Sequence, residues 1–102
     1  MKLFLLSQTE NRGYDTYDSC VVCAEDEKSA KRITPSGDYY KYNEELKVFH
    51  WWCNIGTEKE QYNPEDLCKT WATKIESISV EYLGEAKEKS KSEVICSSFN
   101  AG

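Results

Sequence analysis

Five cysteines and one histidine are the residues of this sequence best suited to chemical reactivity. Cys20 and Cys23 form a Cys-x-x-Cys pair, a spacing that zinc sites and thiol redox centres both use. The pair lies in a run of apolar and β-branched residues that predicts a strand, where residues three apart point to opposite faces. Two thiols on opposite faces cannot share one ion, so we expect small buried thiols and no metal site.

A cysteine–histidine nucleophile would need His50 beside one of the thiols and a third group to orient the imidazole. The spacing selects no such pair, and His50 alternates with Val48 and Trp52 as a packed strand residue would. The five glycines are isolated from one another, which leaves no phosphate-binding loop. We therefore expect no catalytic residue and no cofactor, and a thiol- or zinc-dependent enzyme is only a residual alternative.

A loop between the first two predicted strands holds residue types that anchor protein interfaces and form charge-assisted hydrogen bonds. Its candidate binding residues are Arg12, Tyr14, Asp15, Tyr17 and Asp18. The alternative is that Tyr14 and Tyr17 only cover the edge of a sheet, while the two aspartates form Asx turns.

A tyrosine-rich stretch supplies three further candidate binding residues, Tyr39, Tyr40 and Tyr42. Their rings could stack on bases while Lys41 reaches a phosphate. The formal net charge of −5 argues against a nucleic acid as the direct ligand. A protein partner, or a loop packed on the protein itself, is the favoured interpretation.

Trp51 and Trp52 are adjacent on a predicted strand and must therefore face opposite sides, one of them inward. The sequence does not decide which of the two is exposed. Trp52 is a candidate binding residue because it could join Arg12, Tyr14 and Tyr17 in a pocket for a nucleotide-like molecule. Such a pocket would stack a ring on the aromatic side chains and pair the arginine with a phosphate.

The elements that position these residues follow from hydrophobic periodicity. Strands are predicted over 2–8, 19–24, 46–53, 78–83 and 93–99, and helices over 26–33 and from Asn63 to about Trp71. The first helix has acids at its start and bases at its end, and Pro35 terminates it. Asn63 and Pro64 match a helix cap and a first helical position.

These elements predict one α+β domain over residues 1–102. It contains a mainly antiparallel sheet of four to five strands, one helix packed on a face of the sheet and a second short helix. A composition of 39% hydrophobic and 30% charged residues is typical of a globular protein with a well-solvated surface. The apolar run 3–6 is too short for a signal peptide or a membrane span, so we expect a cytoplasmic protein with free thiols and no membrane contact.

Several segments of the chain resemble a family of small proteins encoded by bacteriophages and prophages. They are Ser7-Gln8, the stretch NRGYDTYDS at 11–19, Val21-Val22 with the acid-rich helix start, YLGEA at 82–86 and SFNAG at 98–102. The resemblance covers both ends of the chain, whereas residues 36–74 do not match. The family has no settled activity, so the resemblance implies an origin in a phage and a location in the cytoplasm of a bacterial host.

Small acidic phage proteins without catalytic motifs commonly act by binding. They block host defence complexes such as CRISPR effectors, or they sequester signalling molecules. The resemblance therefore implies a counter-defence (anti-CRISPR-like) or host-takeover inhibitor that binds a host protein complex. The alternative is a protein that binds or sequesters a small nucleotide-like signal, and the sequence leaves the partner and the oligomeric state open.

Overall fold

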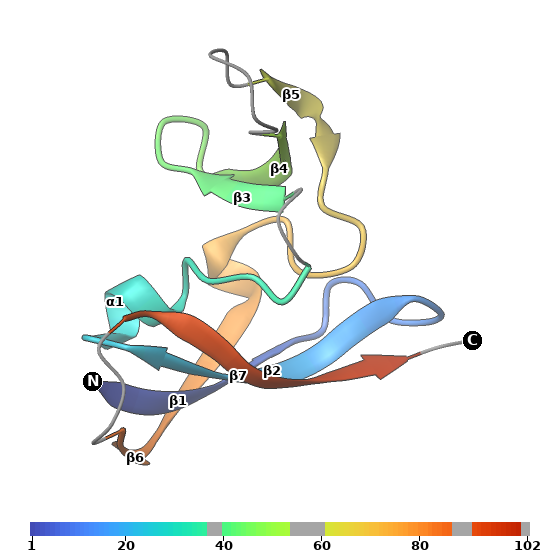
Figure 1. Ribbon diagram of the computed structural model, residues 1–102. Coiled ribbons are helices and arrows are strands. Elements are labelled where there is room, and N and C mark those ends of the chain that lie inside the picture. Colours follow the sequence, from blue (N-terminus) through green and yellow to red (C-terminus); the bar gives the residue numbers. More distant parts are fainter. Residues whose placement is uncertain (37–39, 54–60, 87–90, 101–102) are drawn as a thin grey trace.

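The computed structural model describes residues 1–36, 40–53, 61–86 and 91–100 (Figure 1). In chain order the elements are β1 (Lys2–Gln8), β2 (Thr16–Ala24), α1 (Glu27–Ala30), β3 (Tyr40–Asn43), β4 (Val48–Cys53), β5 (Gln61–Leu67), the 3-10 helix η2 (Ile75–Ser77), β6 (Ile78–Glu85) and β7 (Glu93–Asn100). The strands form two antiparallel sheets, one of four strands in the order β6-β1-β2-β7 and one of three strands in the order β3-β4-β5.

The four-stranded sheet is built around β1, which pairs with β2 on one side and with β6 on the other. The sequence predicts an inner strand here because both faces of residues 2–8 are apolar, and the structure confirms it. Phe4 and Leu6 are buried on one face, while Leu3 and Leu5 are half-buried on the other. One face of the sheet therefore carries the core.

A single hydrophobic core joins the two sheets. Leu6 from β1, Val22 from β2, Phe49 from β4 and Trp71 are fully buried in the same cluster. The segment 68–73 lies between the sheets and bonds to both, because the Phe49 amide donates to the Thr73 carbonyl (2.8 Å) while residue 70 accepts from β2. The two sheets are thus held together by backbone hydrogen bonds as well as by apolar packing.

The predicted α+β fold is wrong, because 55% of the residues lie in strands and 8% are helical. The predicted helix over 26–33 is only the four-residue α1. Its cap is as expected, since the Asp26 carboxylate accepts from the Ser29 amide at 2.7 Å. From Arg32 onward the backbone amides bond to the carbonyl three residues earlier, and Ala30 is the only buried residue of the helix. One turn of helix with one buried alanine cannot cover a sheet face.

The predicted second helix is also wrong, because residues 61–67 form strand β5. Asn63 and Pro64 suit a helix start, but the Asn63 side chain accepts from the Glu65 amide in a local turn (3.1 Å). In β5 the pairing with β4 steps from Asn63 to Leu67, so residues 64–66 bulge out of the ladder. A proline without an N–H is tolerated at such a bulge on an edge strand.

The hairpin of β3 and β4 contains Tyr40 and Tyr42 of the tyrosine-rich stretch. β3 begins at Tyr40, and β4 begins at Val48 rather than at residue 46, because residues 44–47 form the turn. The Asn43 side chain accepts from the amides of Glu45 (3.0 Å) and Leu46 (3.1 Å), as in an Asx turn. Lys47 closes the turn with a positive φ of 59°.

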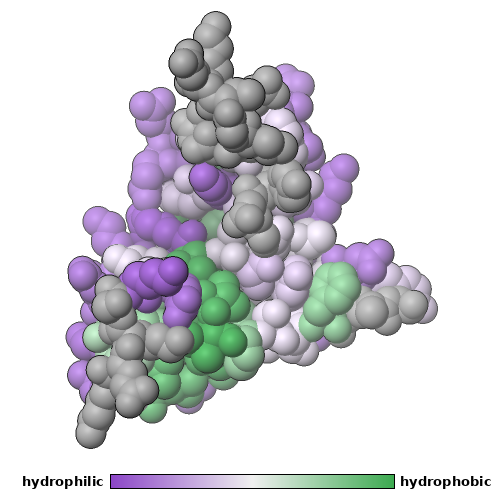
Figure 2. Space-filling model, in the orientation of Figure 1, coloured by the Kyte–Doolittle hydropathy of each residue, from purple (hydrophilic) through white to green (hydrophobic). Residues whose placement is uncertain are grey.

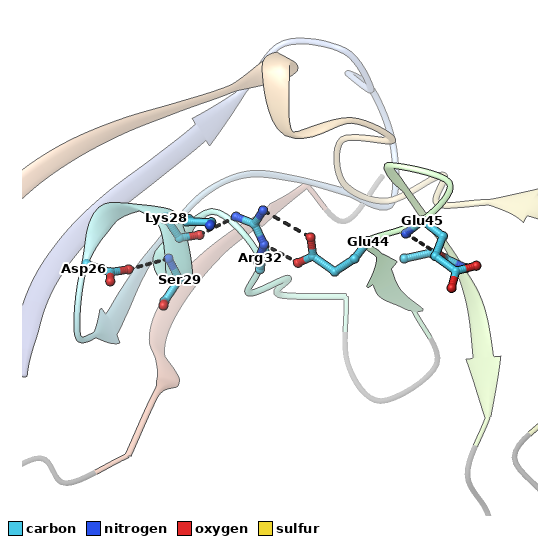
Figure 3. Close-up of polar contacts among 7 residues, drawn as sticks. Asp26, Lys28, Ser29, Arg32, Glu44 and Glu45 are labelled. Atoms are coloured by element: carbon cyan, nitrogen blue, oxygen red, sulfur yellow. Dashed lines mark hydrogen bonds and ion pairs between the residues drawn. The ribbon is translucent and has the colours of Figure 1, made fainter.

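Arg32 connects the end of α1 to this hairpin (Figure 3). Its guanidinium donates to the Lys28 carbonyl at 2.7 Å and pairs with both carboxylate oxygens of Glu44. The same group lies over the Tyr42 ring, 5.3 Å from the ring centre.

In the part of the chain that the structure describes, no helix has the length and apolar character needed to span a membrane.

Candidate functional site

The loop between β1 and β2 is anchored at its base by the side chain of Gln8. This residue is 5% exposed and points into the core face of β1, two positions after Leu6. Its amide oxygen accepts from the Asn11 amide (2.9 Å), and its amide nitrogen donates to the carbonyls of Asn11 and Tyr17 (both 2.8 Å). One buried side chain thereby fixes both ends of the loop.

Asn11 extends this anchor to a distant part of the chain. Its side-chain amide donates to the carbonyls of Cys68 (3.2 Å) and Trp71. The Tyr17 amide at the other end of the loop donates to the Thr70 carbonyl at 2.8 Å. The loop is therefore bonded to the segment that joins the two sheets.

Glu10 provides a charged tie between the loop and the same segment. Its carboxylate accepts from the Thr73 amide (3.1 Å to each oxygen) and from the Thr73 hydroxyl. Burial alone would raise the pKa of Glu10, but hydrogen bonds from Thr73, Ser77 and the Lys74 backbone outweigh it and hold the pKa below its ordinary value of 4.5. The folded protein thus favours the ionised form of Glu10.

We expect this tie to make the stability of the protein depend on pH. A carboxylate with a lowered folded-state pKa stabilises the fold above its unfolded pKa, and that contribution is lost as the pH falls through the folded-state value. Glu10→Gln should therefore unfold at a lower urea concentration than wild type at neutral pH. In acid, where Glu10 is protonated, the difference between the two urea midpoints should shrink to the difference between two neutral hydrogen-bonding side chains. Urea titrations of both proteins across this range measure it, and a difference independent of pH would contradict the assignment.

The tip of the loop carries Arg12 and Tyr14, and both are exposed. Tyr14 is 82% exposed, the largest exposure among the apolar and aromatic side chains that the structure describes. Below it the Thr16 hydroxyl donates to the Gly13 carbonyl (2.9 Å), and Asp15 adopts a positive φ of 58°. The sequence prediction of a surface loop is confirmed, and Arg12, Tyr14 and Asp15 lie together at its tip.

Tyr17 and Asp18 belong to the start of β2 rather than to the tip. Tyr17 is half-buried, and its ring packs against Phe99 of β7 with 4.7 Å between the ring centres. Tyr17 pairs with Phe99 and Ser19 with Ser98, so Asp18 is the extra, exposed residue of a bulge. Tyr17 therefore packs against a neighbouring strand of its own sheet, whereas Tyr14 is exposed at the loop tip.

The tyrosine-rich stretch is packed on the protein itself. Tyr40 and Tyr42 lie in β3, and both are half-buried against the core. The Tyr42 ring is 5.0 Å from that of Phe49, in addition to the Arg32 group above it. Tyr39 lies outside the described residues. Of the alternatives for this stretch, self-packing fits Tyr40 and Tyr42.

Trp52 lies in an aromatic stack of the three-stranded sheet, away from the loop. It is half-buried, and its ring is parallel to that of His50 (5.3 Å, 8°) and 5.1 Å from that of Tyr62. His50 is fully buried, donates from Nδ1 to the Trp51 carbonyl (2.8 Å) and accepts at Nε2 from the Asn43 amide (3.0 Å). The imidazole is therefore a packed structural group, as the sequence predicts.

The predicted nucleotide pocket is not assembled by these positions. Tyr17 packs against Phe99 and Trp52 packs against His50 and Tyr62, so neither ring is shared with the loop tip. Among the described residues, neither Arg12 nor Tyr14 makes a ring contact with another aromatic side chain.

The Cys20 and Cys23 thiols are both buried and point to opposite faces of β2, because the register with β1 is regular between them. Burial, with a smaller contribution from nearby Cys96, raises the pKa of Cys20 to about 12, which keeps this thiol protonated at neutral pH. Within the described ranges no three His, Cys, Asp or Glu side chains are grouped as a metal site would need.

Sequence reasoning identified the tip of the loop but missed its base. Gln8 and Asn11 were not among the predicted site residues, although they determine the shape of the loop. The sequence does contain one signal for the loop base. Gln8 lies on the same face of the predicted strand as Phe4 and Leu6, and a buried polar side chain needs hydrogen-bonding partners. The partners of Asn11 lie about 60 residues away, and no local pattern marks them.

No family model matches this sequence, and neither the curated proteins nor the solved structures contain a match.

Proposed function

We propose that this protein acts by binding a protein partner through the tip of the β1–β2 loop, residues Arg12, Tyr14 and Asp15. The observation that carries the proposal is a Tyr14 side chain 82% exposed above a loop base fixed by Gln8, Asn11 and Thr16. A tyrosine exposed to this degree gains apolar burial only when another molecule covers it.

The fixed base supports tight binding because it removes a cost of association. A flexible loop loses conformational freedom when it binds, whereas a loop already held in one shape loses little. Tyrosine and arginine are the residue types most often found at the energetic centre of protein interfaces. The loop offers both on one preorganised turn.

The partner that we propose is a protein complex of a bacterial host, with the chain acting as a phage counter-defence inhibitor of the anti-CRISPR-like kind or as a host-takeover inhibitor. The support for this origin is the resemblance to phage proteins, which includes the loop sequence itself at 11–19. The net charge of −5 favours a protein partner with a basic surface over a nucleic acid.

The test is an affinity capture from phage-infected host cells, with tagged wild type beside an Arg12→Glu, Tyr14→Ala double variant. We expect wild type to retain a host complex and the double variant to lose it, because an interface centred on these residues loses at least about 2 kcal/mol, a roughly 30-fold change in affinity. Both residues are exposed, so the thermal midpoint should stay close to that of wild type.

A matched control makes the same chemical changes on another exposed turn. The variant Lys47→Glu, Leu46→Ala reverses one positive charge and truncates one exposed apolar side chain between β3 and β4. This control should retain the complex as wild type does. Retention by the double loop variant would exclude the loop as the interface, and capture of no host complex by wild type would refute the proposed function.

A further inference from the structure

Strand β7 is the outer strand of the four-stranded sheet on the side of β2. An outer strand pairs on one side only, and its other side presents unpaired backbone N–H and C=O groups. The chemistry that satisfies such a row of groups is another extended strand. Whether such a strand can pair with β7 depends on the side chains of β7.

The opposite outer strand, β6, has features that discourage pairing. Glu81 is exposed in its middle and Glu85 at its end. Charged side chains on an outer strand are a usual means of preventing contact between sheet edges. β6 is therefore protected.

β7 lacks such charges over most of its length. From Val94 to Asn100 it contains no charged residue and no proline, and Ile95 and Phe99 are 41% and 46% exposed. Figure 2 shows hydrophobic surface in the region where β7 crosses the front of the sheet in Figure 1. Among the described residues, no strand pairs with the outer side of β7.

Ile95 has a special position in this strand. The pairing of β7 with β2 steps from Cys96 opposite Val21 to Val94 opposite Val22, so Ile95 is an extra residue with no partner on β2. Its exposed side chain has no cross-strand neighbour within its own sheet. A strand added outside β7 would supply one.

We propose that the occupant is β7 of a second copy of this chain, paired antiparallel about a two-fold axis at Ser97. In this register Ile95 of each copy lies opposite Phe99 of the other, and Cys96 lies opposite Ser98. Pairs of an aromatic and a β-branched residue are among the most favourable across antiparallel strands. The two copies join their four-stranded sheets into one continuous sheet.

The acidic composition does not oppose a second copy at this edge. The chain has a formal net charge of −5, so two copies repel over most of their surfaces. The segment 94–100 is uncharged, and the antiparallel register places the two Glu93 carboxylates at opposite ends of the contact. β7 is thus a surface on which two acidic copies meet without opposing like charges.

Disulfide trapping tests both the contact and its register. Directly opposite residues on antiparallel strands have Cα atoms about 4.5–5.5 Å apart, within the range that a disulfide spans. Ser97→Cys is introduced in a background with Cys53→Ser and Cys96→Ser, where the remaining thiols of Cys20, Cys23 and Cys68 are buried. Mild oxidation should convert this variant to a covalent dimer, seen on a non-reducing gel.

The matched control is Ser79→Cys in the same background, an exposed serine of the protected outer strand β6. It should stay monomeric under the same oxidation. Equal cross-linking of the two variants, or none in either, would overturn the proposal.

Sedimentation velocity over a concentration series measures the contact without cysteine chemistry. Wild type should reach twice the monomer mass, Ile95→Lys should remain a monomer, and Leu83→Lys, which places the same charge at an exposed position of β6, should dimerise as wild type does. A wild type that is monomeric throughout, or a dimer that Ile95→Lys leaves intact, would refute pairing through β7.

Discussion

A Val22→Asp variant is expected to be unfolded in buffer at 25 °C. Val22 is 0% exposed and lies on β2 between Phe4 of β1 and Val94 of β7, at the centre of the core face. A carboxylate there has no hydrogen-bonding partner and no opposite charge, so the cost exceeds about 4 kcal/mol and approaches the whole stability of a small domain. Loss of the near-ultraviolet circular dichroism of the buried Trp71 measures it.

The control for this change is Val21→Asp, one residue away on the same strand. Val21 is half-buried on the opposite face of the sheet, where the new carboxylate reaches water. This variant should keep a cooperative urea transition with a modestly lowered midpoint. If the two variants had the same midpoint, the assignment of the core to the face of Val22 would be wrong.

The second large effect is expected from Gln8→Leu, which keeps the volume of a buried side chain and removes its three hydrogen bonds. The amide of Asn11 and the carbonyls of Asn11 and Tyr17 lose their partners, and unsatisfied buried groups of this kind cost about 1–3 kcal/mol each where water cannot replace the bond. We expect a loss of about 2–4 kcal/mol in the free energy of unfolding, measured by urea titration.

This substitution also tests whether the shape of the loop serves binding. Arg12 and Tyr14 are unchanged in Gln8→Leu, so a loss of partner affinity in the folded variant would come from the loss of loop order. Thr9→Ala, at an exposed neighbouring position, is the control and should stay within about 0.5 kcal/mol of wild type. A Gln8→Leu protein as stable as wild type would mean that the amide contributes nothing to the loop base.

The strands of the four-stranded sheet could be predicted from the sequence because they are short runs rich in apolar and β-branched residues. The predicted ranges 2–8, 78–83 and 93–99 match β1, β6 and β7 to within two residues at each end. Such runs are a local property of the chain and do not depend on distant partners. The sequence does not record in the same way which strands become neighbours.

The fold class could not be predicted because local helix signals competed with tertiary pairing. Asn63 and Pro64 satisfy the rules for a helix start, yet β4 offers residues 61–67 a strand partner, and the bulge absorbs the proline. Asp26 caps a helix as expected, but only Ala30 is buried and the helix ends after one turn. Helical propensity alone does not stabilise a segment that short.

The candidate site was predicted in part for a similar reason. A tyrosine and an arginine in a glycine-containing loop mark an exposed turn, and Arg12 and Tyr14 are exposed. The roles of Tyr17, Tyr40 and Tyr42 could not be predicted, because their packing partners are Phe99 and Phe49 on strands remote in the sequence or across a hairpin. Residue types show which contacts a side chain can make, while the topology decides whether packing within the protein already uses that side chain.

The strand order β6-β1-β2-β7 has a consequence for synthesis on the ribosome. The hairpin of β1 and β2 emerges first, and both of its outer sides are completed only by β6 and β7, which are translated more than fifty residues later. At roughly 5–20 residues per second the nascent hairpin waits for several seconds with both sides unpaired. Folding of this sheet is therefore a late event of translation, and chaperones that hold extended apolar segments have a defined window in which to act.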